Sequence, residues 1–265
     1  MALDWSTLRE PAPGKLAAAR ETAHYALQWV ARAARANLPA APDDSHSALL
    51  WDAELQGLVT QPLQPGAKLG LRIATLEMVF TKDGKPATLA MPGRTQAAAN
   101  DWLDRELAAR KLKPAAATKL PYEVPVRPFS KERGLDALAR WFAAAAEALG
   151  EARARHQDLA PGPVYLWPHH FDLATLLTVA PEKTIGVGVS PGDHYYAQPY
   201  AYVSTYPAPA DANPPALPPG GHWHGKDFFG AVATADELLA QPDPRAALLA
   251  VIDAAVAAGR GWLHG

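Results

Sequence analysis

Residues 164–179, VYLWPHHFDLATLLTV, combine aromatic, aliphatic and β-branched residues with two adjacent histidines and one carboxylate. This composition predicts a buried β-strand. Side chains on a strand alternate between its two faces, so His170 and Asp172 are expected on one face and His169 on the other. The two histidines of this strand are therefore not expected to serve the same site.

Helical and extended segments surround this stretch in a regular order. Helical periodicity and breakers predict helices over 15–36, 94–110, 131–155 and 244–262. Extended segments are predicted over 48–60, 69–80, 86–91, 164–179, 184–189 and 200–206, with a turn at Lys82–Lys85. The order indicates an α+β fold with a mainly antiparallel sheet on which the helices pack.

The second half of the chain repeats the element order of the first. A shift of 167 − 51 = 116 positions places 166–167 on 50–51, and 185–186 on 69–70. We therefore predict one α+β domain over residues 1–265, with 14–113 and 130–262 as two pseudo-repeats of a helix plus three strands. Few residues are identical in this overlay, so chance agreement of two α+β stretches is the simpler alternative.

Composition and charge exclude several classes of protein. The 265 residues are 49% hydrophobic and include no cysteine, so the core is sizeable and needs no disulfide. Lys and Arg (25) nearly balance Asp and Glu (27), which disfavours a nucleic-acid partner. The start MALDWSTLREP is not typical of a secretion signal, and the apolar stretch ALLAVIDAAVAAG is short and contains Asp253. We expect a cytoplasmic protein that does not cross a membrane.

Imidazole and carboxylate side chains gather in the second half and suggest a metal site. Five of the nine histidines lie between residues 169 and 224. Such nitrogen and oxygen donors suit zinc, iron or manganese. The predicted ligands are His170 and Asp172, completed by His194 or by the H-x-H pair His222 and His224, whose rings project the same way if that segment is extended. No motif such as H-E-x-x-H is present, so histidines that are buried and satisfied, or solvated in a loop, are the simpler alternative.

A second hypothesis needs no metal. His170 or His194 would act as a general base, oriented by Asp172 or Asp193. The pocket would be walled by Trp167, Tyr195, Tyr196, Tyr200 and Tyr202. Trp223 would either act as a lid over it or pack onto the edge of the sheet. Ordinary sheet aromatics are the competing interpretation. The sequence contains neither a Gly-x-Ser-x-Gly elbow nor a phosphate-binding glycine loop, which disfavours those nucleophilic and nucleotide-binding mechanisms.

Several segments in this order resemble the DUF5996 family of bacterial proteins. The most specific are Phe171–Ala174, FDLA, and Ser190–Gly192, SPG, with an aromatic strand that ends in Tyr206-Pro207; the others are HSALLWDAELQGLVTQPLQPG, LEMVFTKDGKPATLAM and KLPYEVPVRPFSKE. The resemblance implies an α+β domain and supplies no activity. Where the family pattern has Trp-Gly-Ser before FDLA, this chain has Pro-His-His, so the resemblance implies that Asp172 belongs to the shared scaffold and that the histidines do not.

Two functional hypotheses follow. In the first, the protein is a small-molecule binding protein or an enzyme, with a pocket in the second half built around Asp172 and His170, the candidate catalytic residues. Trp167, Tyr195, Tyr200 and Trp223 are the predicted ligand-binding residues, and a divalent metal is a candidate cofactor. In the second, the protein is structural and contacts a partner through the Pro-rich loop 207–221. The sequence gives no oligomeric state.

Overall fold

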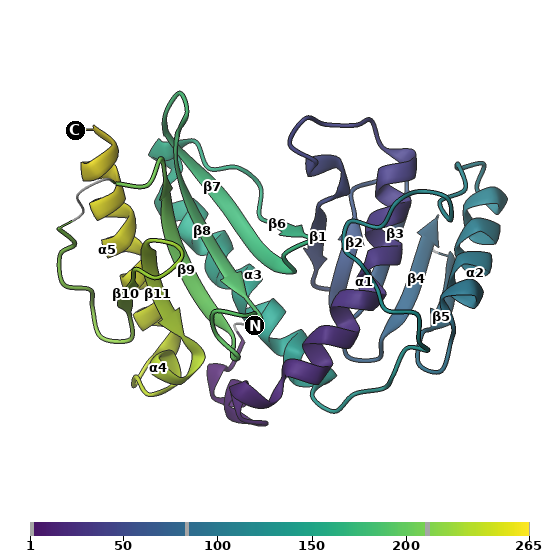
Figure 1. The fold of residues 1–265 in the computed structure, drawn as a ribbon, viewed down its shortest axis with the longest axis horizontal. Helices are drawn as coiled ribbons and strands as arrows, with labels where there is room; N and C mark the ends of the chain where they lie inside the picture. Colours follow the sequence, from purple (N-terminus) through teal and green to yellow (C-terminus); the bar gives the residue numbers. More distant parts are fainter. Residues whose placement is uncertain (1–2, 83–84, 210–212, 265) are drawn as a thin grey trace. The chain divides into compact units, whose positions relative to one another are not determined.

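The computed structural model describes residues 3–82, 85–209 and 213–264 (Figure 1). The chain forms two compact units. The N-terminal unit comprises Leu16–Ala139 and Tyr165–Phe171, and the C-terminal unit comprises Met1–Lys15, Arg140–Val164 and Asp172–Gly265. Residues 83–84 of the predicted turn and residues 210–212 of the Pro-rich loop lie outside the described residues.

The elements follow one another as helices and antiparallel strands. The helices are α1 (Ala17–Asn37), α2 (Gln96–Ala109), α3 (Leu135–Arg155), α4 (Ala235–Leu239) and α5 (Pro244–His264). The strands are β1 (Leu49–Asp52), β2 (Gly57–Thr60), β3 (Ala67–Arg72), β4 (Glu77–Lys82), β5 (Lys85–Ala90), β6 (Tyr165–Trp167), β7 (Asp172–Ala180), β8 (Lys183–Ser190), β9 (Tyr200–Tyr206), β10 (His222–His224) and β11 (Gly230–Thr234).

In the N-terminal unit the strands lie in the order β6-β1-β2-β3-β4-β5, and the neighbours are antiparallel. Helix α1 packs against β2 and β3 through an alanine-rich face. The amide oxygen of Asn100 in α2 accepts hydrogen bonds from the buried Trp29 indole (2.8 Å) and from Arg32 (2.7 Å), both in α1. This shared acceptor ties α2 to α1, because buried donors are costly without partners.

In the C-terminal unit the strands lie in the order β10-β11-β9-β8-β7, again antiparallel. The register places Val187 and Val189 of β8 opposite Val203 and Ala201 of β9, and all four are buried. Helices α3 and α5 cover this apolar face: Trp141 and Ala145 of α3 line a recess with Val189, and Gly259 of α5 lies against Ile185 and Thr205. The same registers place Gly186, Gly188, Tyr202 and Ser204 on the opposite face, which we call the polar face.

The predicted α+β fold with a mainly antiparallel sheet and packed helices is confirmed. Whether the two units descend from one repeat stays a prediction. By length and composition α5 is apolar enough to cross a membrane, but its buried side chains include Leu248, Ile252 and Val256, as in the core helix of a folded unit.

Three segments were predicted to be extended throughout, but each of them contains a tight turn. Residues 48–60 form β1 and β2, residues 69–80 contribute to β3 and β4, and residues 164–179 form β6 and β7. In the last case the backbone N–H groups of His170 and Phe171 donate to the carbonyl of Trp167, and Phe171 has φ 63°. The Pro168–Phe171 segment is therefore a turn, and strand alternation does not apply to His169 and His170.

Candidate functional site

The turn Pro168–Phe171, which follows Trp167 and is called the WPHH turn, has a structural anchor that the sequence did not indicate. The carbonyl of Pro168 accepts hydrogen bonds from His24 Nε2 (2.7 Å) and Gln28 Nε2 (2.8 Å), both on α1. The His24 ring is stacked on Phe171, with centroids 4.9 Å apart, and lies 4.2 Å from the Tyr122 ring. Burial lowers the pKa of His24 to about 4, so its imidazole is neutral at pH 7 and donates one N–H to the turn.

The predicted pairing of His170 with Asp172 on one strand face is wrong. His170 lies in the turn of the N-terminal unit, where its ring is exposed and 4.2 Å from that of His169. Asp172 begins β7 in the C-terminal unit and is 7% exposed. The two side chains do not share the face of one strand, because the turn separates them. Trp167 ends β6 and contacts Tyr165 edge to face, so it belongs to the N-terminal unit.

Asp172 receives a hydrogen bond from the Tyr202 hydroxyl across strand β8. Gly188, on β8, lies opposite both Ala174 of β7 and Tyr202 of β9. A Cβ at Gly188 would overlap the Tyr202 ring, so the missing side chain is what lets the phenol reach over β8 to the carboxylate. Burial, followed by the charge of Asp172, raises the pKa of Tyr202 well above its ordinary value. The Tyr202 hydroxyl therefore stays protonated and donates its hydrogen bond to Asp172.

A second phenol and carboxylate pair lies beside the first. The Tyr200 hydroxyl donates to Asp193 Oδ2 at 2.6 Å, and the Tyr200 ring lies 6.2 Å from that of Tyr202. Burial and the hydrogen bond to Asp193 raise the pKa of Tyr200. The other oxygen of Asp193 accepts the backbone N–H groups of Tyr195 and Tyr196, which fixes the loop between β8 and β9.

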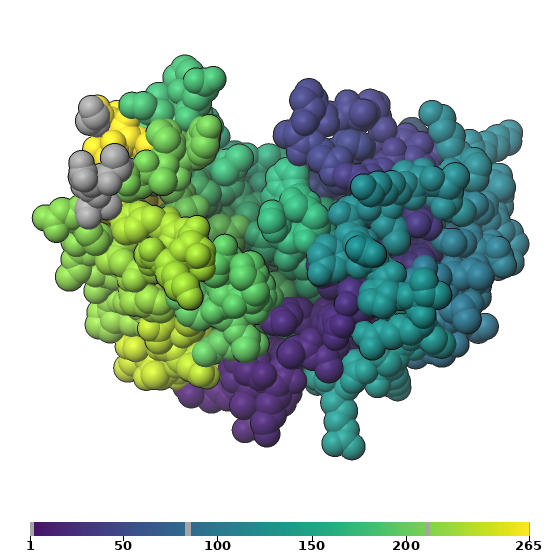
Figure 2. Space-filling model, in the orientation of Figure 1, coloured from purple at the N-terminus to yellow at the C-terminus, as the bar shows by residue number. Residues whose placement is uncertain are grey.

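A third phenol, Tyr196, contacts two histidines on β10. Its hydroxyl lies 3.0 Å from His222 Nε2 and 2.7 Å from His224 Nδ1. Both rings therefore face the same hydroxyl, as expected for H-x-H in an extended segment. His222 Nδ1 in turn lies 2.8 Å from Glu237 Oε1. In the space-filling view, the green and yellow-green segments that carry these residues are at the surface of the C-terminal unit (Figure 2).

Glu237 is held in place by the start of α4. It forms a capping box with Thr234, whose backbone N–H and hydroxyl both donate to Glu237 Oε2. Burial raises the pKa of Glu237, but the hydrogen bonds from Thr234 and the contact with His222 outweigh it, and the net shift is downward. Burial, with the charges of Glu237 and Asp193, raises the pKa of Tyr196.

The remaining predicted residues are spread over this unit. His194 is exposed, and its ring lies 3.9 Å from that of Tyr195, which also contacts His224 at 5.9 Å. Trp223 points away from its two histidine neighbours. Its ring is stacked on Phe229 at 5.5 Å and packs against Trp262 of α5, and its indole donates to the carbonyl of Pro215. Trp223 is therefore part of an aromatic cluster on the helical side, which argues against the predicted lid.

The described part of the chain contains no group of three or more His, Cys, Asp or Glu side chains that could hold a metal ion. His170, Asp172, His194, His222 and His224 thus do not assemble into one metal centre. The structure distributes them over the WPHH turn, the start of β7, the loop after β8, and β10.

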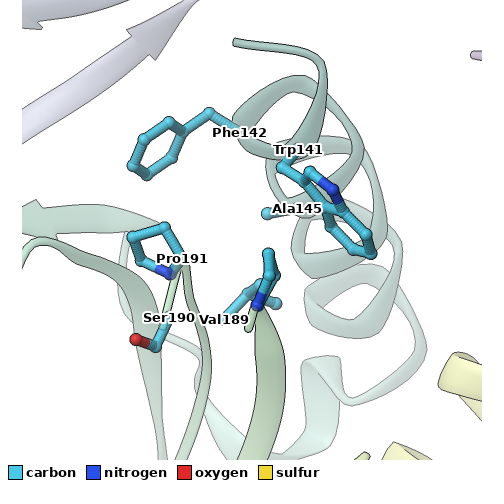
Figure 3. Close-up of a pocket in the computed structure, with 7 residues that line it drawn as sticks. Trp141, Phe142, Ala145, Val189, Ser190 and Pro191 are labelled. Carbon is cyan, nitrogen blue, oxygen red and sulfur yellow. The ribbon is translucent and has the colours of Figure 1, made fainter. Parts of the chain in front are cut away.

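An apolar recess lies on the helical side of the C-terminal sheet. Trp141, Phe142 and Ala145 of α3 face Val189, Ser190 and Pro191 across it (Figure 3). Its free volume is about 10 Å³, whereas small-molecule sites usually measure about 300 Å³ or more. We regard it as a packing gap and not as a binding site.

The chain matches no protein-family model, no curated protein and no solved structure. The resemblance to the DUF5996 family stays a prediction.

Proposed function

We propose that the protein is a small-molecule binding protein or an enzyme whose site lies on the polar face of the C-terminal sheet, around Asp172, Tyr202 and Tyr200. The observation that carries this proposal is the hydrogen bond between the half-buried Tyr202 and the buried Asp172, which spans β8 over Gly188. Burial of a carboxylate is costly, and a sheet face that only needs packing is filled at lower cost by apolar residues. Perturbed, buried titratable groups are concentrated at functional sites.

The surroundings suit a polar ligand with a flat or apolar portion. Tyr202 and Tyr200 stay protonated, so their hydroxyls donate, while Asp172 and Asp193 accept. A ligand that carries a hydroxyl or ammonium group would compete for these carboxylates. Small residues continue along the same face at Gly186, whose nearest neighbour for an added Cβ is Ser204 Oγ at 3.6 Å.

Two exposed apolar side chains flank this floor of small residues. Leu176 of β7 is 52% exposed and Tyr206 of β9 is 68% exposed. Large apolar side chains that stay exposed beside buried polar groups are typical of binding surfaces. The ligand class we expect is therefore a hydroxylated or amine-bearing metabolite with an apolar ring or chain.

A thermal-shift screen against polar metabolites tests the proposal. A ligand stabilises the native state by mass action, so hits raise the melting temperature of the wild type. The shift should disappear in Asp172→Asn and in Tyr202→Phe, and persist in Tyr165→Phe, the matched control on β6 of the N-terminal unit. Circular dichroism verifies that each variant is folded.

Hits that shift all three variants equally would place the ligand elsewhere and refute the proposal. A screen without hits, together with copurification of a protein partner that is lost on deletion of loop 207–221, would instead favour the interaction hypothesis.

A further inference from the structure

We propose that Tyr196, His222 and His224 form a binding site for one transition-metal ion of the class that accepts imidazole, Cu²⁺ or Zn²⁺. The site lies at β10, the edge strand of the C-terminal sheet. It uses two of the histidines that the sequence singled out and a phenol from the loop after β8. It does not depend on an organic ligand at Asp172.

Two imidazole nitrogens face the same phenol oxygen. His222 Nε2 and His224 Nδ1 lie 3.0 and 2.7 Å from the Tyr196 oxygen. Metal bonds to nitrogen and oxygen donors are about 2.0–2.2 Å long, which places neighbouring donors of one ion about 3 Å apart. The two nitrogen-to-oxygen distances are therefore close to those between adjacent ligands of one ion, and all three side chains are half-buried.

The outer nitrogen of each ring faces a group that only accepts hydrogen bonds. His222 Nδ1 faces the Glu237 carboxylate at 2.8 Å, and His224 Nε2 faces the Lys226 carbonyl at 2.5 Å. These partners assign the ring protons to the outer nitrogens. A carboxylate or carbonyl behind each imidazole is the arrangement that orients histidine ligands in metal sites.

The inner nitrogens then present two lone pairs to one hydroxyl. Tyr196 has a single O–H proton, so it can donate to only one of the two imidazoles while both are neutral. One of the two nitrogen lone pairs therefore receives no proton from Tyr196. A metal ion supplies a positive centre between the rings, because it accepts both nitrogen lone pairs and the phenol oxygen together.

The donors are also held in orientation before any ion binds. The His224 ring is stacked on Phe228, with centroids 4.2 Å apart and planes 21° apart. Glu237 is fixed by the capping box of α4, and Tyr196 by its backbone hydrogen bond to Asp193. The His222 and Glu237 side chains are each 38% exposed, so an ion reaches the cluster from solvent. Pre-organised donors with solvent access are what a binding site requires.

Isothermal titration of the full chain with Zn²⁺, and separately with Cu²⁺, tests the site. We expect one equivalent to bind. Binding should be lost in His222→Ala and in His224→Ala, and Glu237→Gln should weaken it about 10- to 100-fold, the usual effect of removing an outer partner. On copper binding Tyr196 would release its hydroxyl proton to solvent, so copper should also give a visible phenolate-to-metal absorption band that is absent in Tyr196→Phe.

Two controls separate this site from other histidines. His194→Ala removes an exposed histidine of the same unit, and a double variant of His169 and His170 to Ala removes the adjacent pair of the WPHH turn. Both should bind as the wild type does. Loss of binding only in the double variant, binding that survives His222→Ala and His224→Ala, or no saturable binding would each overturn the proposal. Circular dichroism and melting curves show whether the variants are folded.

Discussion

His24 makes the N-terminal unit sensitive to acid. Its imidazole is stacked on Phe171, lies 4.2 Å from the Tyr122 ring and donates to the Pro168 carbonyl, so protonation would charge a ring that burial keeps neutral. The pKa of His24 is lowered from 6.5 to about 4, chiefly by desolvation. At a pH between these two pKa values, His24 is protonated in the unfolded chain and neutral in the folded chain. The stabilisation is complete above pH 6.5 and is lost as the pH falls towards 4.

The shift sets the size of the effect. One pKa unit corresponds to about 1.4 kcal/mol, so the loss between neutral pH and pH 4 approaches about 3 kcal/mol. At pH 5 the free energy of unfolding is about 2 kcal/mol lower than at neutral pH, which corresponds to an increase of about 30-fold in the unfolded population.

Native-state hydrogen exchange of the α1 amides at pH 7.5 and pH 5, corrected for intrinsic exchange rates, measures this loss for the N-terminal unit alone. The variant His24→Gln keeps an N–H donor for Pro168 but does not titrate, so it should lose about 2 kcal/mol less than the wild type on acidification. His194→Gln, at an exposed position, is the matched control and should behave as the wild type. If His24→Gln shows the same pH dependence as the wild type, the burial of a neutral imidazole is not the cause.

Two glycine predictions concern the packing of the C-terminal unit. Gly188→Ala should lower stability by about 1–3 kcal/mol, because its Cβ would overlap the Tyr202 ring. Gly186→Ala is the control and should leave stability almost unchanged in thermal denaturation. Equal losses for the two variants would contradict this explanation. Gly259→Ala on α5 should also destabilise, because its Cβ would lie 2.9 Å from a methyl group of β9. In the same assay Gly261→Ala, with open space around it, should instead raise stability by up to about 1 kcal/mol.

The long helices were predictable because their periodicity extends over several turns. The predicted helix 15–36 corresponds to α1 (Ala17–Asn37), and 131–155 corresponds to α3 (Leu135–Arg155). Local pattern suffices for such elements.

The positions of the strands were predictable, but the turns that separate them were not. The turn after β1 depends on the Asp52 carboxylate, which accepts the backbone N–H groups of Glu54 and Leu55. The turns before β4 and β7 depend on Leu76 and Phe171 in the left-handed region, with φ 53° and 63°. Apolar residues rarely adopt that conformation, so nothing in their identity announces a turn. This is why the strand geometry predicted for His170 and Asp172 was wrong.

Of the candidate site, the sequence indicated the residue types but not their partners. The H-x-H spacing correctly placed His222 and His224 on one side of a strand. Their outer and inner partners, Glu237 and Tyr196, are brought in by tertiary structure. A local signal for Glu237 was present, since T-x-x-E at 234–237 is a capping-box pattern that predicts a fixed glutamate at a helix start. The Tyr202 and Asp172 pair depends on strand register and on Gly188, and neither follows from local sequence.

Hydrogen exchange of the chain with and without the compound that gives the largest thermal shift tests whether the small-molecule site lies around Asp172 and Tyr202. We expect ligand-dependent protection in the strands of the polar face, in residues 172–176, 186–190 and 200–204. Protection confined to the N-terminal unit, or to loop 207–221, would contradict a small-molecule site around Asp172 and Tyr202.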